Sequence, residues 1–178
     1  MGPWEVLTYW TRNHPDDGFD VMTFADSLAP VTCAKGLRIL PDTTTQEIPD
    51  LEVMVYPGGQ GTRPRLSDMP HLTWVREQRS RVPLMTSVCT GSLVYAAAGL
   101  LRNRPATTHW GSLDLLAELD PTIEIRRDDR FVEDGDIITS AGVSAGIDMA
   151  LRLVQRLAGT DRAREVRRGI QYDPHPPV

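Results

Sequence analysis

The sequence predicts one α/β domain, built on a mainly parallel sheet with helices on both faces. Strand-like and helix-like patterns alternate along all 178 residues, and no linker, repeat or low-complexity segment separates them. Two short, nearly continuous apolar runs, residues 51–56 and 82–88, are typical of strands buried on both faces. The apolar fraction of 40% and the net charge of −5 suit a chain that folds around a core. We therefore expect a single domain over residues 1–178.

The first half of the chain shows a helix, strands and a further helix. Pro3 in a first helical turn begins the first helix, and helical spacing returns after the glycine-rich turn at residues 57–61. The expected elements are a helix at 3–10, a strand at 20–25, a hairpin-like stretch at 31–40, a strand at 51–56, a helix at 70–79 and a strand at 82–88.

The second half is dominated by helices. Residues 90–101 are apolar around most of the helix circumference, which predicts a central helix packed on several sides. A helix at 111–119 precedes strands at 123–127 and 136–140, which we expect to flank a turn at 133–135. A long helix begins near Ser144, and a last helix covers about 161–171, with Thr160 or Asp161 as its N-cap.

Composition excludes several classes of function. The longest apolar stretch, residues 93–101, is about half the length of a membrane-spanning helix, and the N-terminus has no signal-peptide pattern, so we expect a cytoplasmic protein. The net negative charge argues against nucleic acid as a partner. Cys33 and Cys89 form no disulfide framework and are expected to be reduced. The four histidines, His14, His71, His109 and His175, lack metal-ligand spacing, so no metal is expected.

Cys89 is the strongest candidate for chemistry. It follows directly on a predicted buried strand and precedes a predicted helix, the arrangement that exposes a nucleophile at a sharp turn. Backbone N–H groups at the start of that helix favour the thiolate, which is the reactive form of cysteine. The competing interpretation is a small buried apolar residue, the commonest role of cysteine.

Two further segments are expected near Cys89. The turn that contains Gly58 and Gly59 permits close backbone approach, and the N–H groups of Gly59 and Thr90 together would form an oxyanion hole. His109 would accept or orient a proton if the fold brings it back to the thiol. Either segment has an ordinary alternative, a simple turn and a structural histidine.

The minor candidates have ordinary interpretations. Asp16 and Asp17 lie between Pro15 and Gly18 in a typical turn sequence, Cys33 lies in a strand-like run, and the arginines of the last helix suit a solvated face or a subunit contact.

Four segments together resemble the DJ-1/PfpI superfamily, and within it the isonitrile hydratase-like branch. They are YPGGQGTR (56–63), SVCTGSLVYAAAGLLRNRPATTHW (87–110), TSAGVSAGIDMAL (139–151) and IQYDPHPP (170–177). The most specific part is Cys89-Thr90-Gly91-Ser92 with Thr107-Thr108-His109-Trp110 twenty residues later.

The resemblance implies a flavodoxin-like, class I glutamine amidotransferase-like fold, a homodimer and no cofactor. It implies Cys89 as nucleophile, Thr90 as the following residue that lines the site, Gly59 as an oxyanion donor and His109 as the nearby histidine. The implied reaction is hydration of a small isocyanide to an N-substituted formamide through a Cys89 thioimidate, with a carboxylic acid supplying the proton.

One feature departs from the family pattern. Family members carry a strand and a loop ending in an acidic residue before the first helix, whereas this sequence begins at Met1-Gly2-Pro3. The resemblance therefore implies a sheet that lacks its first strand and a cysteine that lacks its acidic partner. We hypothesise that the coding sequence begins further upstream.

Other activities of the same superfamily remain open. Cysteine hydrolases and glyoxalase-like or deglycating enzymes use the same cysteine turn, and a redox sensor or regulator domain would use the thiol without turnover. Class I amidotransfer is disfavoured because no His-x-Glu pair follows Gly111, where His175 precedes only Pro-Pro-Val.

Overall fold

A four-stranded sheet forms the centre of the computed structural model, which describes residues 1–174. Its strands run in the order β5 (Val53–Tyr56), β6 (Leu84–Val88), β10 (Ile137–Ser140) and β9 (Phe131–Asp134). The first three are parallel and β9 is antiparallel to β10. All of β10 and nearly all of β6 are buried, and the apolar run at residues 82–88 predicts this for β6.

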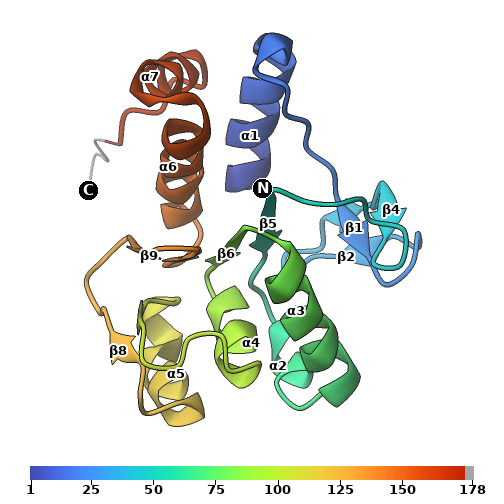
Figure 1. Cartoon of the computed structure of the whole chain (residues 1–178), viewed down its shortest axis with the longest axis vertical. Coiled ribbons are helices and arrows are strands. Elements are labelled where there is room, and N and C mark those ends of the chain that lie inside the picture. Colours follow the sequence, from blue (N-terminus) through green and yellow to red (C-terminus); the bar gives the residue numbers. More distant parts are fainter. Residues whose placement is uncertain (175–178) are drawn as a thin grey trace.

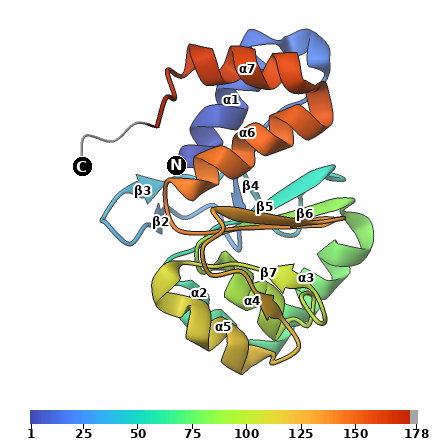
Figure 2. The same ribbon diagram turned by 90° about the vertical axis from the view of Figure 1, so that its left-hand side faces the viewer.

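Helices cover both faces of this sheet, which confirms the predicted layers (Figures 1 and 2). One layer contains α1 (Gly2–Asn13), α6 (Ala145–Ala158) and α7 (Thr160–Gly169). The other contains α2 (Thr62–Arg65), α3 (Met69–Arg81), α4 (Gly91–Ala97) and α5 (Leu113–Leu119). Short 3-10 turns occupy Pro15–Asp17 and Trp110–Ser112. No helix within residues 1–174 combines the length and apolar character needed to cross a bilayer.

Three two-stranded sheets lie outside the central sheet. β1 (Phe24–Ala25) pairs in parallel with β4 (Thr43–Thr44), and β2 (Val31–Thr32) pairs with β3 (Arg38–Ile39) as the predicted hairpin. β7 (Pro105–Ala106) pairs in parallel with β8 (Glu124–Ile125). In the part of the chain described, β5 is hydrogen-bonded to a strand on one side only and forms an edge of the central sheet.

The structure corrects several predicted boundaries. The strand opposite β10 across the turn is β9, whereas residues 123–127 supply β8, which pairs with the segment after Arg104. The central helix ends at Ala97 because Gly99 adopts a φ of +80°. The N-cap of α7 is Gly159, with Thr160 as the first helical residue. The predicted strand at 20–25 is reduced to β1.

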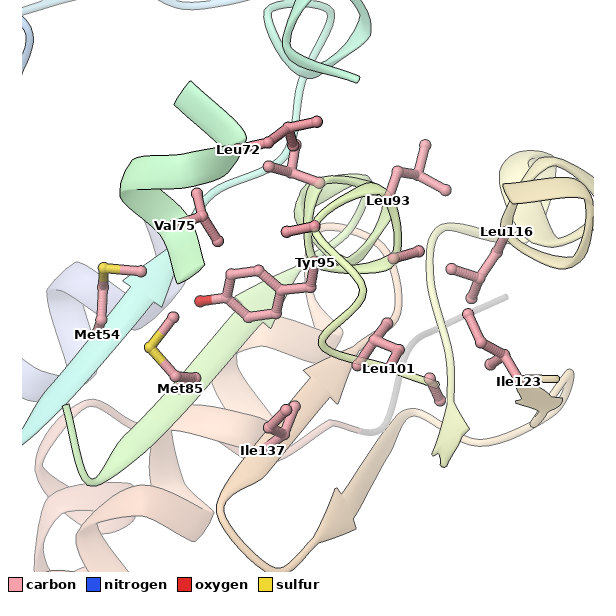
Figure 3. Packing of buried hydrophobic residues seen from close by; sticks show 14 of the residues in the cluster. Met54, Leu72, Val75, Met85, Leu93, Tyr95, Leu101, Leu116, Ile123 and Ile137 are labelled. Atoms are coloured by element: carbon pink, nitrogen blue, oxygen red, sulfur yellow. The ribbon is translucent and has the colours of Figure 1, made fainter. Parts of the chain in front are cut away.

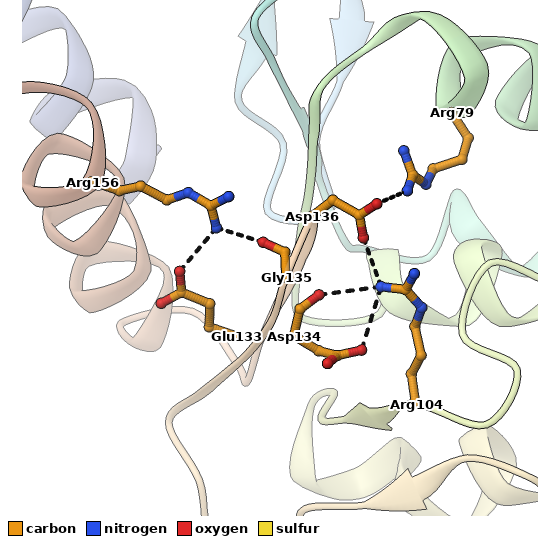
Figure 4. A network of polar contacts seen from close by, with 7 residues as sticks. All are labelled: Arg79, Arg104, Glu133, Asp134, Gly135, Asp136 and Arg156. Atoms are coloured by element: carbon orange, nitrogen blue, oxygen red, sulfur yellow. Dashed lines mark hydrogen bonds and ion pairs between the residues drawn. The ribbon is translucent and has the colours of Figure 1, made fainter.

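Ion pairs fix the turn between β9 and β10 (Figure 4). Asp136 binds Arg79 of α3 and accepts a hydrogen bond of 2.7 Å from Arg104, which also lies 3.3 Å from the Asp134 carboxylate. Glu133 binds Arg156 of α6 at 2.9 Å. The turn is thereby tied to both helical layers.

The larger hydrophobic core lies between the sheet and the α2–α5 layer (Figure 3). Tyr95 of α4 is fully buried in it, and its hydroxyl donates a hydrogen bond of 2.8 Å to the carbonyl oxygen of Thr86 in β6. Burial raises the pKa of Tyr95 well above its usual value, and the neighbouring Tyr56 adds to the effect. The bond fixes the helix that follows Cys89 against the strand that precedes it.

We expect Tyr95→Phe to lower the free energy of unfolding by about 1 kcal/mol, because it removes one buried hydrogen bond and keeps the ring. Urea denaturation followed by circular dichroism measures the change. The matched control is Tyr9→Phe, since the half-buried Tyr9 hydroxyl makes no hydrogen bond within residues 1–174. Equal stability of wild type and Tyr95→Phe would contradict the assignment.

Candidate functional site

Cys89 occupies a sharp turn between β6 and α4, and it is partly exposed. Its φ is +57°, a left-handed conformation that is uncommon for any residue with a Cβ. The Cys89 amide donates to the carbonyl oxygens of Ser140 at 3.0 Å and Ala141 at 3.1 Å. Its carbonyl oxygen accepts a hydrogen bond of 2.9 Å from the Thr108 hydroxyl. Hydrogen bonds on both sides therefore hold the strained backbone in place.

Two glycines let the loop after β5 pack against this turn. A Cβ added to Gly58 would lie 2.7 Å from both the Cβ of Cys89 and the amide nitrogen of Thr90. A Cβ at Gly91 would overlap the carbonyl oxygen of Tyr56. Contacts this close leave no room for a side chain at either position.

Hydroxyl groups connect the same loop to Thr90. The Gly59 amide donates a hydrogen bond of 2.9 Å to the Thr90 hydroxyl, and the Thr62 hydroxyl donates one of 2.8 Å to the Gly59 carbonyl oxygen. The two hydroxyl oxygens of Thr62 and Thr90 lie 3.1 Å apart, and both residues are buried. The Gly59 amide thus has the Thr90 hydroxyl as its acceptor in this structure, and its role as an oxyanion donor stays a prediction. The Thr90 amide has no hydrogen-bond acceptor within residues 1–174.

Thr62 was not predicted from the sequence. It is the first residue of a four-residue helix directly after the glycine turn, and this helix is too short to give a periodic pattern. The one sequence signal for a role of Thr62 in the site is its place directly after the glycine-rich turn at residues 57–61.

His109 follows Thr108, whose hydroxyl binds the Cys89 carbonyl oxygen, so the histidine segment lies near the sharp turn at Cys89–Thr90, which we call the elbow. Its Nδ1 accepts a hydrogen bond of 3.2 Å from the Gly111 amide. Its ring packs on Gly142, where an added Cβ would lie 2.6 Å from the His109 Cδ2 atom. Within the described chain, neither His109 nor a carboxylate forms a hydrogen bond with the Cys89 sulfur. The geometry therefore brings the loop, the thiol and the histidine segment to one edge of the sheet without a direct His–Cys contact.

The minor sequence candidates have structural partners. Asp17 accepts hydrogen bonds from the indole of Trp10 at 2.6 Å and from Arg162 at 2.6 Å, and the Arg162 bond is the main reason that the pKa of Asp17 is lowered. Cys33 lies in the turn after β2. No group of three His, Cys, Asp or Glu side chains within residues 1–174 is arranged to hold a metal ion. His175 lies outside the described residues.

A second set of polar and aromatic side chains involves Tyr56, the last residue of β5 before the glycine loop. The Tyr56 hydroxyl is 2.6 Å from Nε2 of His71, whose ring stacks on Trp74 with centroids 5.6 Å apart. Burial raises the pKa of Tyr56 to about 12 and lowers the pKa of His71, with Arg65 adding to the effect on His71. Because the Tyr56 carbonyl oxygen contacts Gly91, this group supports the elbow from the side opposite β10.

The sequence matches the DJ-1/PfpI family over residues 1–156. The chain belongs to this family. It is 43% identical to isonitrile hydratase of Pseudomonas putida, over 99% of this chain and 73% of that protein. It is also 28% identical to the glutathione-independent glyoxalase DJR-1.2 of Caenorhabditis elegans, over 84% of this chain and 79% of the relative.

A solved structure agrees with this assignment. The ThiJ/PfpI family protein from Pseudomonas syringae superposes with a TM-score of 0.88 at 36% identity, covering 99% of this chain and 70% of that one. The flavodoxin-like α/β fold expected for the DJ-1/PfpI family is therefore confirmed.

We expect Gly58→Ala to slow alkylation of Cys89 by iodoacetamide and to lower the free energy of unfolding by about 1–3 kcal/mol, because the new methyl group overlaps the elbow. Stopped alkylation followed by mass spectrometry measures the rate. Gly61→Ala is the matched control, since a Cβ there meets nothing within 4 Å. If both variants behave alike, Gly58 does not set the geometry of the elbow.

Stability is also expected to depend on His71 at mildly acidic pH. The pKa of His71 is lower in the folded protein than its usual 6.5, so the unfolded chain takes up a proton first as the pH falls. The contribution of neutral His71 to the free energy of unfolding is therefore complete above about pH 6.5 and declines as the pH falls below that value. The unfolding midpoint of His71→Gln should fall less than that of wild type between about pH 7.5 and 5. His14→Gln controls for the other described histidine near a carboxylate, and parallel curves for wild type and His71→Gln would refute the prediction.

Proposed function

We propose that this protein is a cysteine-dependent enzyme that hydrates an isocyanide to an N-substituted formamide. The observation that carries the proposal is the left-handed, partly exposed Cys89 at the carboxyl ends of parallel strands, where ligands bind in sheets of this kind. The 43% identity to a protein named isonitrile hydratase supports this substrate class.

The chemistry needs only the thiol and water. The Cys89 sulfur forms a bond to the terminal carbon of R–NC and the thiol proton is transferred to the same carbon, which gives the thioimidate R–N=CH–S–Cys89. Water then adds across the C=N bond, with its hydroxyl group on that carbon and its other proton on the nitrogen. The C–S bond breaks, the thiol regains its proton and R–NH–CHO is released. Atoms balance without an oxidant or a cofactor.

The surrounding groups suit these steps. The Thr90 amide, left uncovered because residue 58 is a glycine, is the proposed donor to charge that develops during attack. Gly59 would join it as an oxyanion donor when its amide leaves the Thr90 hydroxyl. His109 is the proposed proton carrier, because its Nδ1 accepts from Gly111 and its Nε2 has no hydrogen-bond partner among residues 1–174.

A glyoxalase-type reaction is the second candidate, because a relative with that name covers most of this chain. The same thiol would then add to an aldehyde carbon.

A homodimer also remains a prediction, and the exposed Leu28, Val31, Leu37 and Leu40 between β1 and β4 offer an apolar surface for a second copy. Cytoplasmic location and cofactor independence likewise remain predictions.

We expect wild-type protein to convert cyclohexyl isocyanide to its formamide and Cys89→Ser to lower the rate at least about a thousandfold. Proton nuclear magnetic resonance follows the formyl hydrogen. Cys33→Ser is the control and should keep the wild-type rate. Turnover of methylglyoxal with no formamide from the isocyanide would favour the glyoxalase reaction over hydration. Turnover of neither compound would contradict both enzymatic functions and favour a thiol-based sensor.

A further inference from the structure

Arg63 differs from most arginines of this protein in its partner. Arginines elsewhere in the described chain are commonly paired with carboxylates, as Arg79 and Arg104 are with Asp136. Arg63 has no carboxylate within ion-pair distance among residues 1–174, and its guanidinium donates one hydrogen bond of 3.1 Å to the hydroxyl of Ser112. The arginine is exposed and Ser112 is buried. One hydrogen bond thus orients a positive charge that no acidic side chain of residues 1–174 pairs with.

This bond connects the two segments that flank the cysteine turn. Arg63 follows Thr62, whose hydroxyl lies 3.1 Å from that of Thr90. Ser112 ends the 3-10 turn that begins directly after His109, close to Thr108, whose hydroxyl binds the Cys89 carbonyl oxygen. One end of the bond therefore follows a residue that contacts the Thr90 side chain, and the other end follows the segment that contacts the Cys89 backbone. From this connectivity we infer that the guanidinium is within reach of a ligand bound at the elbow.

Guanidinium chemistry suggests what this charge binds. The group carries five N–H donors in a planar fork that matches a carboxylate, and the bond to Ser112 uses one of them. A charge-assisted bond to an anion is stronger than one to a neutral acceptor. The remaining donors favour a ligand with a carboxylate over its neutral ester.

We propose that Arg63 selects ligands that carry a carboxylate close to the carbon attacked by Cys89. Resting on the proposed hydration, this makes isocyanides with a carboxylate substituent the preferred substrates, and it makes Arg63 a specificity-determining residue. The alternative is a purely structural link between α2 and the turn at Trp110–Ser112.

Alkylation of Cys89 tests the proposal without reference to turnover. In a Cys33→Ser background, we compare the rates with iodoacetate, an anion, and iodoacetamide, its neutral analogue. We expect Arg63→Gln to lower the iodoacetate rate about three- to fivefold, the range of an exposed ion pair, and to leave the iodoacetamide rate unchanged. Arg63→Lys should keep part of the preference. Arg168→Gln, an exposed arginine of α7 without a carboxylate partner in the described chain, is the control and should change neither rate.

Substrate comparison then tests the selectivity in catalysis. Potassium isocyanoacetate should have a higher kcat/KM than methyl isocyanoacetate, and Arg63→Gln should remove the difference by raising the KM of the acid alone. If neither compound reacts, hydration fails as the function and the alkylation ratio still decides whether Arg63 binds anions. Equal loss of both alkylation rates in Arg63→Gln, or no change in either, would overturn the proposal.

Discussion

The left-handed backbone of Cys89 is the constraint on which the rest of this site depends. A residue with a Cβ adopts this conformation at a cost, so surrounding contacts must supply the stabilisation. They do so through the carbonyl oxygens of Ser140 and Ala141, which bind the amide, and the hydroxyl of Thr108, which binds the carbonyl oxygen. These groups come from two parts of the chain that are distant from Cys89 in sequence, so the elbow exists only in the complete fold.

Parallel strands make this convergence inevitable. Because β5, β6 and β10 run in one direction, the segments that follow them all begin at the same edge of the sheet. The glycine loop, the cysteine and the Ser140–Ala141 backbone are therefore neighbours by topology. The ion pairs of Asp136 hold the start of β10, and the buried Tyr95 hydroxyl binds β6. Contacts that stabilise the core therefore also fix the geometry of the site.

The strands and long helices of the central layers were predictable, because burial on two faces produces apolar runs such as residues 82–88. Gly58 and Cys89 follow neighbouring parallel strands, β5 and β6, so their proximity follows from the predicted topology, whereas His109 follows β7 outside the central sheet and its position depends on the complete fold. The β9 strand was missed, since Phe131–Asp134 is short and half charged, and its pairing depends on the turn rather than on periodicity. Arg63 and Thr62 were missed because a helix of four residues carries no pattern, and only the folded chain shows what their side chains meet.

The hydrogen bond from the Gly59 amide to the Thr90 hydroxyl has an energetic consequence. A neutral ligand that takes this amide exchanges one hydrogen bond for an equivalent one and gains little. A group that acquires negative charge gains more, because ionised acceptors form the stronger bond. In the proposed reaction, the Thr90 hydroxyl would therefore occupy the Gly59 amide in the ground state and release it to an anionic transition state, so that the amide binds the transition state more strongly than the substrate.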